Sequence, residues 1–381
     1  MNDFTFSYPT KVYFGASAAK RAIEEELGRF GARVMLACGE RSAKGNGVYD
    51  EIAQLLRAAG KEVVEFSGIM PNPTYAKAQE GAAMAREAGV DFILALGGGS
   101  VIDCCKVIAA QAVLDGDIWD MEYVSHRFPS AGIPMGAVVT ASGTGAEMNG
   151  GAVITHEEKL WKGGIFCSAP VFAALDPAYT LTVPRMQVMS GAFDTLSHAM
   201  ETYLGTSDRD NVSDEVSLAV MRSTVVNMRR AMADLSDLQA RGNLMWVAAM
   251  AENGVLKIGR LTDFQAHQIE HQLGAYTNCN HGQGLAVIQP VYYRHILNDA
   301  REKLDRFAQV VFDEPDAEAG LSALEALVAE AGLPTRLSEL EAKAQITPEL
   351  LRKVADSSNL ISSNPRTLDH DEIYRILLEC M

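Results

Sequence analysis

The sequence has few cysteines, and they form no pattern of a disulfide-stabilised protein. Six cysteines are spread over 381 residues without a C-x-x-C pair, and the adjacent Cys104 and Cys105 are poorly placed to bridge. The chain also has no run of about 18 apolar residues and no basic region ahead of an apolar core at its start. We therefore expect reduced cysteines, no membrane segment and a cytoplasmic location.

Positive charge is also scarce. Lysine and arginine number 33 against 49 aspartate and glutamate residues, which gives a formal net charge of −16. The overall field of such a protein repels a phosphate backbone or an anionic membrane, so we exclude nucleic acid and membranes as partners. A small anionic cofactor remains compatible with this charge, because a few oriented N–H groups at one site outweigh distant, screened charges.

The order of the apolar runs predicts two domains. Up to about Pro184, short strand-like runs alternate with helical patterns, and after it almost every segment has a helical period; the clearest helical segments are 212–232, 238–257 and 317–331. Alternation of strands and helices implies βαβ crossovers and a parallel sheet. We predict a Rossmann-like α/β dinucleotide-binding domain at residues 1–183 and an all-α metal-binding and substrate domain at residues 184–381.

A glycine-rich turn follows one of the predicted strands. Residues 92–96 are apolar and lead into Gly97-Gly98-Gly99-Ser100, which opens an apolar helix reaching about Val113. Glycines let the backbone approach a diphosphate, and a helix N-terminus favours anionic oxygens. Taken alone, a tight turn with Ser100 as the N-cap explains the pattern equally well. A second hydroxyl-rich turn, residues 140–147, follows the strand-like run 135–139 and favours a bound dinucleotide.

The segment Cys38-Gly39-Glu40-Arg41 follows another predicted strand, where an open sheet presents the adenosine ribose. An acidic side chain there binds ribose hydroxyls and repels a 2′-phosphate, whereas an arginine attracts the phosphate. The chain supplies both Glu40 and Arg41, and a solvated charged loop is an equally good interpretation. NAD and NADP therefore both stay open.

Histidines and a carboxylate cluster in the predicted helical domain. Asp194 and His198 are four residues apart, His267 and His271 have the same spacing, and His281 follows shortly after. One carboxylate oxygen with imidazole nitrogens suits Fe(II) or Zn(II). The glutamate that a zinc metalloprotease needs directly after the first histidine is missing, and we expect Glu270 to lie on another part of the helix. A metal together with a dinucleotide fits hydride transfer to a polarised carbonyl.

Ordered motifs along nearly the whole chain carry a resemblance to one family. They are residues 9–15, Pro71-Asn72-Pro73, residues 97–103, Leu175-Asp176-Pro177, and the series Asp194, His198, His267, His281. In these motifs the chain resembles the iron-containing (group III) alcohol dehydrogenases, within them the butanol dehydrogenases and broad-range aldehyde reductases. The resemblance implies a dehydroquinate synthase-like fold, NAD(P)H-dependent interconversion of small aldehydes and alcohols, and a homodimer.

The resemblance also implies roles for individual residues. Asp194, His198, His267 and His281 would bind one divalent metal, Fe(II) or Zn(II), and His271 would be a catalytic or proton-relay group beside nicotinamide and substrate. The expected cofactor contacts, including those from the two turns and the ribose loop, are Gly39, Glu40, Asn72, Gly97, Gly98, Gly99, Ser100, Asp103, Thr140, Ser142 and Lys162. Many relatives carry an acidic residue where Gly39 stands, so strict NAD dependence does not follow.

Two other functions fit parts of the pattern. A dehydroquinate synthase-type lyase also combines a nicotinamide with a metal, but it needs a basic pocket for a phosphorylated, acidic substrate. The segments around Asp194 and His267 contain few lysines or arginines. A non-catalytic metal or nucleotide sensor is disfavoured because all four ligand positions and both glycine turns are intact.

Overall fold

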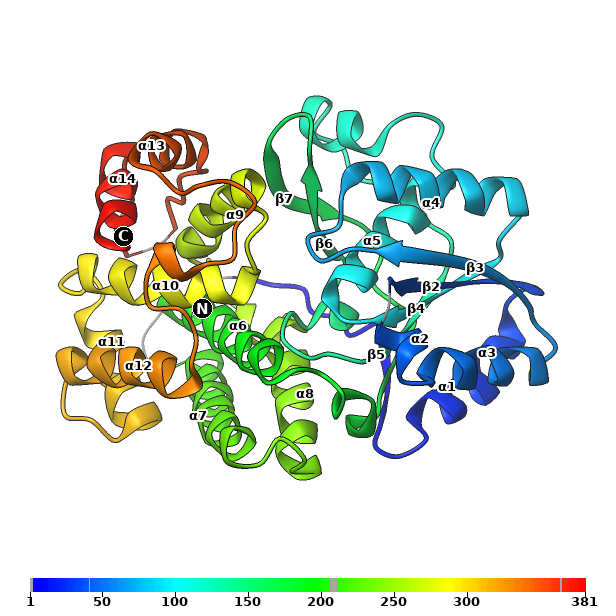
Figure 1. The fold of residues 1–381 in the computed structure, drawn as a ribbon, viewed down its shortest axis with the longest axis horizontal. Helices are drawn as coiled ribbons and strands as arrows, with labels where there is room; N and C mark the ends of the chain where they lie inside the picture. Colours follow the sequence, from blue (N-terminus) through cyan, green and yellow to red (C-terminus); the bar gives the residue numbers. More distant parts are fainter. Residues whose placement is uncertain (1–2, 41, 206–210, 364) are drawn as a thin grey trace. The chain divides into compact units, whose positions relative to one another are not determined.

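The computed structural model describes residues 3–40, 42–205, 211–363 and 365–381. Contacts between residues divide it into two compact units. One unit is Tyr8–Val183, and the other joins residues 3–7 to the chain from Pro184 onward (Figure 1). Residues 3–7 thus group with the second unit, although we expected them in the first domain. Arg41, expected near the ribose, lies outside the described residues.

A six-stranded parallel sheet forms the centre of the first unit. Its strand order is β1-β8-β5-β4-β2-β3. The strands are β1 (Lys11–Phe14), β2 (Arg33–Gly39), β3 (Glu62–Ile69), β4 (Phe92–Gly97), β5 (Met135–Val139) and β8 (Phe172–Leu175). From β2 the chain passes outward to β3 and then returns to the other side of β2 as β4. The carboxyl ends of β2 and β4 therefore flank a topological switch point, where open α/β sheets bind ligands.

Helices cover this sheet because its inner strands are apolar on both faces. They are α1 (Ala18–Glu26), α2 (Ser42–Gly45), α3 (Val48–Ala58), α4 (Tyr75–Ala88) and α5 (Gly99–Gln111). Alternate residues of β2, such as Val34 and Leu36, pack into a core cluster with α1 and α3. The intervening residues Met35 and Ala37 are also fully buried. Burial on both faces is the property expected of a parallel sheet between helical layers.

An antiparallel pair of strands that the sequence did not predict completes the first unit. Strands β6 (Gly151–His156) and β7 (Trp161–Phe166) pair with each other and not with the main sheet. A Cβ on Gly163 would lie 1.9 Å from the Trp161 ring, so glycine is needed there. Glycines of this kind interrupt the alternation by which a strand is recognised in a sequence.

The second unit consists of helices, with no strand in its described ranges. The helices are α6 (Arg185–Leu204), α7 (Val212–Ala233), α8 (Leu238–Glu252), α9 (Gln265–Thr277), α10 (His281–His295), α11 (Arg301–Phe307), α12 (Ala317–Ala331), α13 (Pro348–Ser357) and α14 (His370–Glu379). The α/β sheet followed by helices confirms the predicted fold class. None of the helices in the described part of the chain is long and apolar enough to cross a membrane.

Helix α6 is the central helix of this unit. Every residue from Val188 to Leu204 is buried, and the helix packs against α7, α8 and α10. A helix that is buried all round has no solvated face for polar side chains. Its buried carboxylates and histidine therefore indicate a site rather than a surface.

Two details of the predicted helices were wrong. The helix expected at residues 238–257 ends at Glu252, because Gly254 has a φ of +88° and a separate short 3-10 turn, Val255–Lys257, follows. Ser100 does not cap α5: Gly98 occupies the N-cap position and no side chain caps this helix. The interpretation of Ser100 as an N-cap is thereby excluded.

Candidate functional site

Three helices supply the predicted metal ligands. Asp194 and His198 lie on one face of α6, His267 lies in the first turn of α9, and His281 is the first residue of α10. A Cβ on Gly282 would lie 2.3 Å from the carbonyl oxygen of Ser190 on α6. Because position 282 has no side chain, the start of α10 can lie directly against the α6 backbone.

The three histidine side chains converge on Asp194. The Nε2 atoms of His198, His267 and His281 lie 3.7, 3.9 and 3.5 Å from Oδ1 of Asp194. One possible ligand atom from each of the four residues lies within 4.8 Å of the others. Three imidazole nitrogens and one carboxylate oxygen form a donor set that suits a divalent transition metal.

Two of these atoms lack the partners that burial normally demands. Oδ1 of Asp194 and Nε2 of His267 are buried, and neither accepts or donates a hydrogen bond to any residue that the structure describes. An unsatisfied buried polar atom costs about 1–3 kcal/mol, and more when it is charged. A cation between these atoms would remove the cost, so the residues present fit a bound metal.

Electrostatics at the cluster favour ionised Asp194. Burial by itself raises the pKa of Asp194, but the neighbouring His198 and His281 outweigh this and hold the pKa well below its usual range. For His267, burial by itself lowers the pKa, but Glu201 and Asp194 outweigh this and raise the pKa to about 10. For His198 the effect of burial prevails, and its pKa is lowered. Asp194 is therefore ionised and offers a carboxylate oxygen to a cation.

Two buried glutamates contact histidines that are predicted metal ligands, and the sequence analysis missed both contacts. Nδ1 of His267 is in hydrogen-bond contact with Oε2 of Glu201, and Nδ1 of His281 with Oε2 of Glu270. Both glutamates are fully buried. Glu270 lies in the second turn of α9, beyond His267 as expected, but the start of α10 brings His281 to it. The spacing of Glu201, three residues after His198, could have indicated a role beside the cluster.

His271 lies beside the cluster. It is buried, and its ring centroid is 5.4 Å from that of His281 and 6.0 Å from that of His267. Atoms of Glu270, His271 and His281 also lie within 4.8 Å of one another. This location is compatible with a proton-relay role, which stays a prediction.

An aromatic residue in a strained conformation closes one side of the cluster. Phe264, directly before α9, has a φ of +60°, which is rare for a bulky residue. Its ring centroid lies 5.0 Å from that of His267 and 6.1 Å from that of His198. Backbone strain of this kind persists where the surrounding structure enforces it, often at functional sites.

In the first unit, the two predicted glycine turns lie against each other. Strands β4 and β5 are neighbours, and the Thr140 N–H donates to the Gly97 carbonyl at 3.0 Å. A Cβ on Gly99 would lie 2.2 Å from Oγ1 of Thr144, and one on Gly98 would lie 3.2 Å from Cβ of Ala141. The glycines are therefore needed for the close approach of the turns as well as for any approach of a diphosphate.

The other expected cofactor residues lie at or near the same edge of the sheet. Gly39 ends β2 beside β4, with Glu40 exposed after it, and Asn72 has a φ of +50° in the segment after β3. Ser100 is on the first turn of α5, and Ser142 is half-buried in the second glycine turn. Contact of these residues with a cofactor stays a prediction.

Asp103 and Lys162 are engaged in the antiparallel strands. Asp103 on α5 pairs with Lys106 at 3.2 Å and accepts a hydrogen bond from the Val153 N–H of β6 at 2.9 Å. Lys162 lies on β7, buried, opposite Thr155 of β6. Asp103 thus has a structural partner in the strand pair that carries Lys162. This contact does not depend on a cofactor.

Comparison with known proteins gives a consistent result. The family model "Iron-containing alcohol dehydrogenase" matches residues 9–177, and the C-terminal model of the same family matches residues 188–381. An NADH-dependent butanol dehydrogenase A from Clostridium acetobutylicum is 39% identical over 301 residues, covering 78% of this chain and 77% of that protein. The NADPH-dependent aldehyde reductase YqhD from Escherichia coli is 33% identical over 367 residues, covering 93% of this chain and 94% of that protein.

A solved structure agrees over the entire chain. The NADH-dependent butanol dehydrogenase A from Thermotoga maritima superposes with a TM-score of 0.92 at 32% identity, covering 100% of this chain and 99% of the other. The chain therefore belongs to the iron-containing alcohol dehydrogenase family, in its butanol dehydrogenase branch.

Proposed function

We propose that this protein is a metal-dependent, NAD(P)H-linked alcohol dehydrogenase that interconverts small aldehydes and primary alcohols. The observation that carries the proposal is the cluster of buried Asp194, His198 and His267 with half-buried His281, in which two polar atoms lack hydrogen-bond partners among the described residues. This cluster occurs in a chain whose relatives include a butanol dehydrogenase and an aldehyde reductase.

The four clustered side chains would hold one divalent metal, Fe(II) or Zn(II), in the second domain, residues 184–381. When bound, a metal polarises a carbonyl as a Lewis acid and a reduced nicotinamide supplies a hydride. Asp194 and the three histidines position the metal, and His271 moves a proton between the alcohol oxygen and solvent through its imidazole. Asp194, His198, His267 and His271 are buried, which limits the access of water to them and strengthens their electrostatic effect.

The cofactor would lie at the carboxyl edge of the sheet in the first domain, residues 1–183. The switch point between β2 and β4, flanked by Gly39 and the turn at Gly97, supports this location. The N–H groups at the start of α5 suit a diphosphate, because this thirteen-residue helix begins without a side-chain cap. The relatives use NADH in one case and NADPH in the other, so both cofactors belong in the assay.

We also propose a homodimer in the cytoplasm that acts on a small aldehyde or alcohol. The six free cysteines are in keeping with a reducing compartment. Sedimentation of the purified protein tests the dimer.

One experiment separates the reductase from the lyase and sensor alternatives. Purified protein is assayed for NADH and NADPH oxidation with butyraldehyde, before and after metal removal, and with Fe(II) or Zn(II) restored. We expect turnover that is lost by orders of magnitude without metal and recovered with it, while cofactor binding is largely retained. Full-rate reduction by the metal-free protein, or no oxidation of either cofactor with any short aldehyde, would reject the proposed function.

A further inference from the structure

We propose that Glu201 and Glu270 are positioning residues that hold the imidazoles of His267 and His281 in the tautomer and orientation required for metal binding. This inference rests on the proposed function, because it needs a metal at the cluster. It adds two residues that the ligand motif does not contain, and it assigns each of them to one ligand.

Glu201 holds both the ring and the backbone of His267. Its carboxylate accepts hydrogen bonds from the N–H groups of Ala266 at 2.6 Å and His267 at 3.2 Å, and contacts Nδ1 of the His267 ring. These N–H groups belong to the first turn of α9, where an anion also interacts favourably with the helix dipole. One buried carboxylate on α6 therefore fixes where α9 begins and how its ligand side chain is turned.

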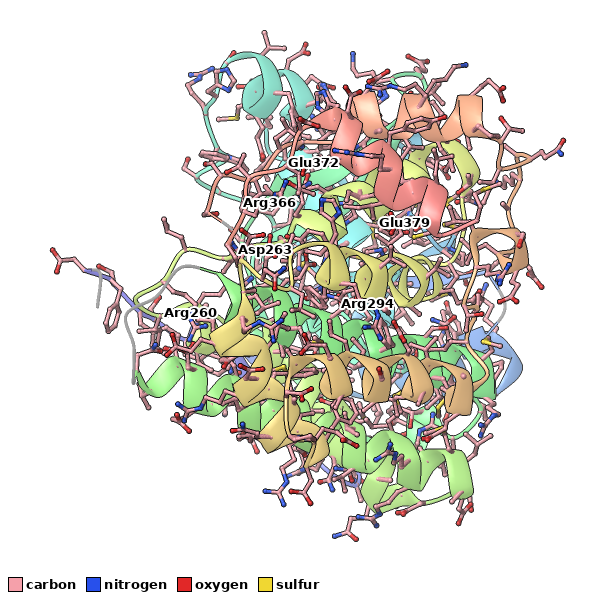
Figure 2. All side chains as sticks on the ribbon, turned by 90° about the vertical axis from the view of Figure 1, so that its left-hand side faces the viewer. Arg260, Asp263, Arg294, Arg366, Glu372 and Glu379 are labelled. Carbon is pink, nitrogen blue, oxygen red and sulfur yellow. The ribbon has the colours of Figure 1, made fainter. Side chains whose placement is uncertain are left out.

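The end of α6 that carries Glu201 is itself anchored. The N–H of Asp263 donates to the Glu201 carbonyl at 3.1 Å, and the buried guanidinium of Arg260 donates to the Thr202 carbonyl at 3.0 Å. Arg260 and Asp263, both labelled in Figure 2, belong to the segment that leads into α9. The Glu201 carboxylate thus has little freedom to follow a misplaced histidine.

Glu270, in the second turn of α9, contacts the ring of His281. Its carboxylate is fully buried and contacts Nδ1 of His281. A Cβ on Gly284 would lie 2.8 Å from Cγ of Glu270. The absence of a side chain at position 284 therefore lets the Glu270 side chain lie against the start of α10, whose first residue is the ligand.

A carboxylate at Nδ1 determines which imidazole nitrogen is free to bind a metal. A histidine that donates its Nδ1–H to a carboxylate presents Nε2 as a lone pair, and the carboxylate raises the basicity of that nitrogen. In both histidines Nε2 is the atom nearest Oδ1 of Asp194. His198 differs, because its buried Nδ1 has no hydrogen-bond partner in the described ranges of the chain. Two of the three imidazoles are therefore oriented by glutamate.

The test uses Glu201→Gln and Glu270→Gln, which keep the size of the side chain and one acceptor oxygen but remove the charge. The matched control is Glu372→Gln, since Glu372 is also a buried carboxylate in contact with an imidazole, at 3.2 Å from Nε2 of His295, and does not belong to the cluster. Glu372 lies beside Arg366 on the face shown in Figure 2. Each variant is prepared metal-free as the full chain, and its melting temperature is recorded.

Two readouts besides turnover are measured. Zn²⁺ affinity is determined by competition with a chelator, and Co²⁺ is added as a probe whose visible absorption reports the ligand geometry. We expect each glutamate variant to bind Zn²⁺ about 10- to 100-fold more weakly than wild type, with an altered Co²⁺ spectrum, while Glu372→Gln matches wild type. The metal-free melting temperatures of the glutamate variants should stay close to that of the wild type.

The outcomes separate this inference from the proposed function. If wild type binds Zn²⁺ and both glutamate variants bind it with unchanged affinity and an unchanged Co²⁺ spectrum, the inference is wrong and the proposed function stands. A loss of affinity that only follows a lower metal-free melting temperature shows a structural role for the glutamates and also overturns the inference. A wild type that binds neither Zn²⁺ nor Co²⁺ rejects the proposed function and the inference with it.

Discussion

Nε2 of His267 lies 3.9 Å from Oδ1 of Asp194, although the two residues belong to different helices and neither atom has a hydrogen-bond partner among the residues that the structure describes. Buried polar atoms normally have hydrogen-bond partners, and the described residues supply none to either of these two atoms. A cation bound between them would account for their position.

Replacement of His267 by alanine should remove most of the bound metal and most of the turnover. Changes in residues that only support ligands cost about 10- to 100-fold in affinity or activity, and loss of a ligand should cost at least as much. Elemental analysis of the purified variant and aldehyde reduction rates measure both effects. His295→Ala is the control, because His295 lies at the end of α10 and contacts Glu372. Full metal content and full turnover in His267→Ala would reject the metal site.

A side chain at Gly98 should weaken cofactor binding and leave the metal content unchanged. A Cβ at this position meets Ala141 at 3.2 Å, so Gly98→Val would displace the second turn or occupy the space of the diphosphate. NADH and NADPH binding are measured by titration. Gly28→Val serves as a control, since a Cβ on Gly28 has no neighbour within 4 Å. Unchanged cofactor affinity in Gly98→Val would reduce the glycine turn to a packing feature.

An acidic residue in place of Gly39 should lower the preference of the enzyme for NADPH relative to NADH. A Cβ there meets only the Ile69 carbonyl oxygen, at 3.4 Å, so Gly39→Asp can be accommodated without backbone strain. A carboxylate at the end of β2 repels a 2′-phosphate and binds ribose hydroxyls. We expect kcat/KM for NADPH to fall about tenfold or more relative to that for NADH, equivalent to about 1.4 kcal/mol. An unchanged ratio of the two values would place the ribose elsewhere.

His271→Ala should lower turnover and flatten its pH dependence near neutrality. A positioned general acid or base contributes about 10²- to 10⁴-fold, and His271 is the buried histidine beside the cluster that is not a predicted ligand. The measurement is the pH profile of kcat, with metal content determined at each pH. A lower rate with an unshifted profile would contradict the proton relay and assign His271 a role in packing.

Glu147 should make the first unit less stable as the pH rises. Burial raises the pKa of this carboxyl from its usual 4.5 to about 7. Between these values the folded protein holds a proton that the unfolded chain has lost, so stability falls with increasing pH, by up to about 3 kcal/mol in total. Glu147→Gln removes this loss. We expect the variant to melt at a higher temperature than wild type at about pH 8 and to differ little at about pH 5; equal pH dependence of the two proteins would refute the assignment.

Some features of this protein follow from local sequence alone. Helix α12 occupies the predicted residues 317–331, and β5 the predicted residues 135–139. Asp316 caps α12 and Gly332 ends it in the left-handed conformation, so the residues that set both boundaries are adjacent to the helix in the sequence. The spacing of Asp194 and His198 placed both on one face of a helix for the same reason: helical periodicity is a local property.

Other features depend on contacts that no local pattern contains. The β6 and β7 pair was missed because glycines interrupt its alternation, and one of them, Gly163, is placed by contact with the Trp161 ring. The contact of Glu270 with His281 was missed because the turn between α9 and α10 decides which face of α9 meets the next helix. The sequence by itself determined the fold class and the spacing of the predicted ligands, since these follow from composition and period. Only the tertiary structure decided which carboxylates meet which imidazoles, because those contacts join residues whose separation along the chain carries no information about their distance in space.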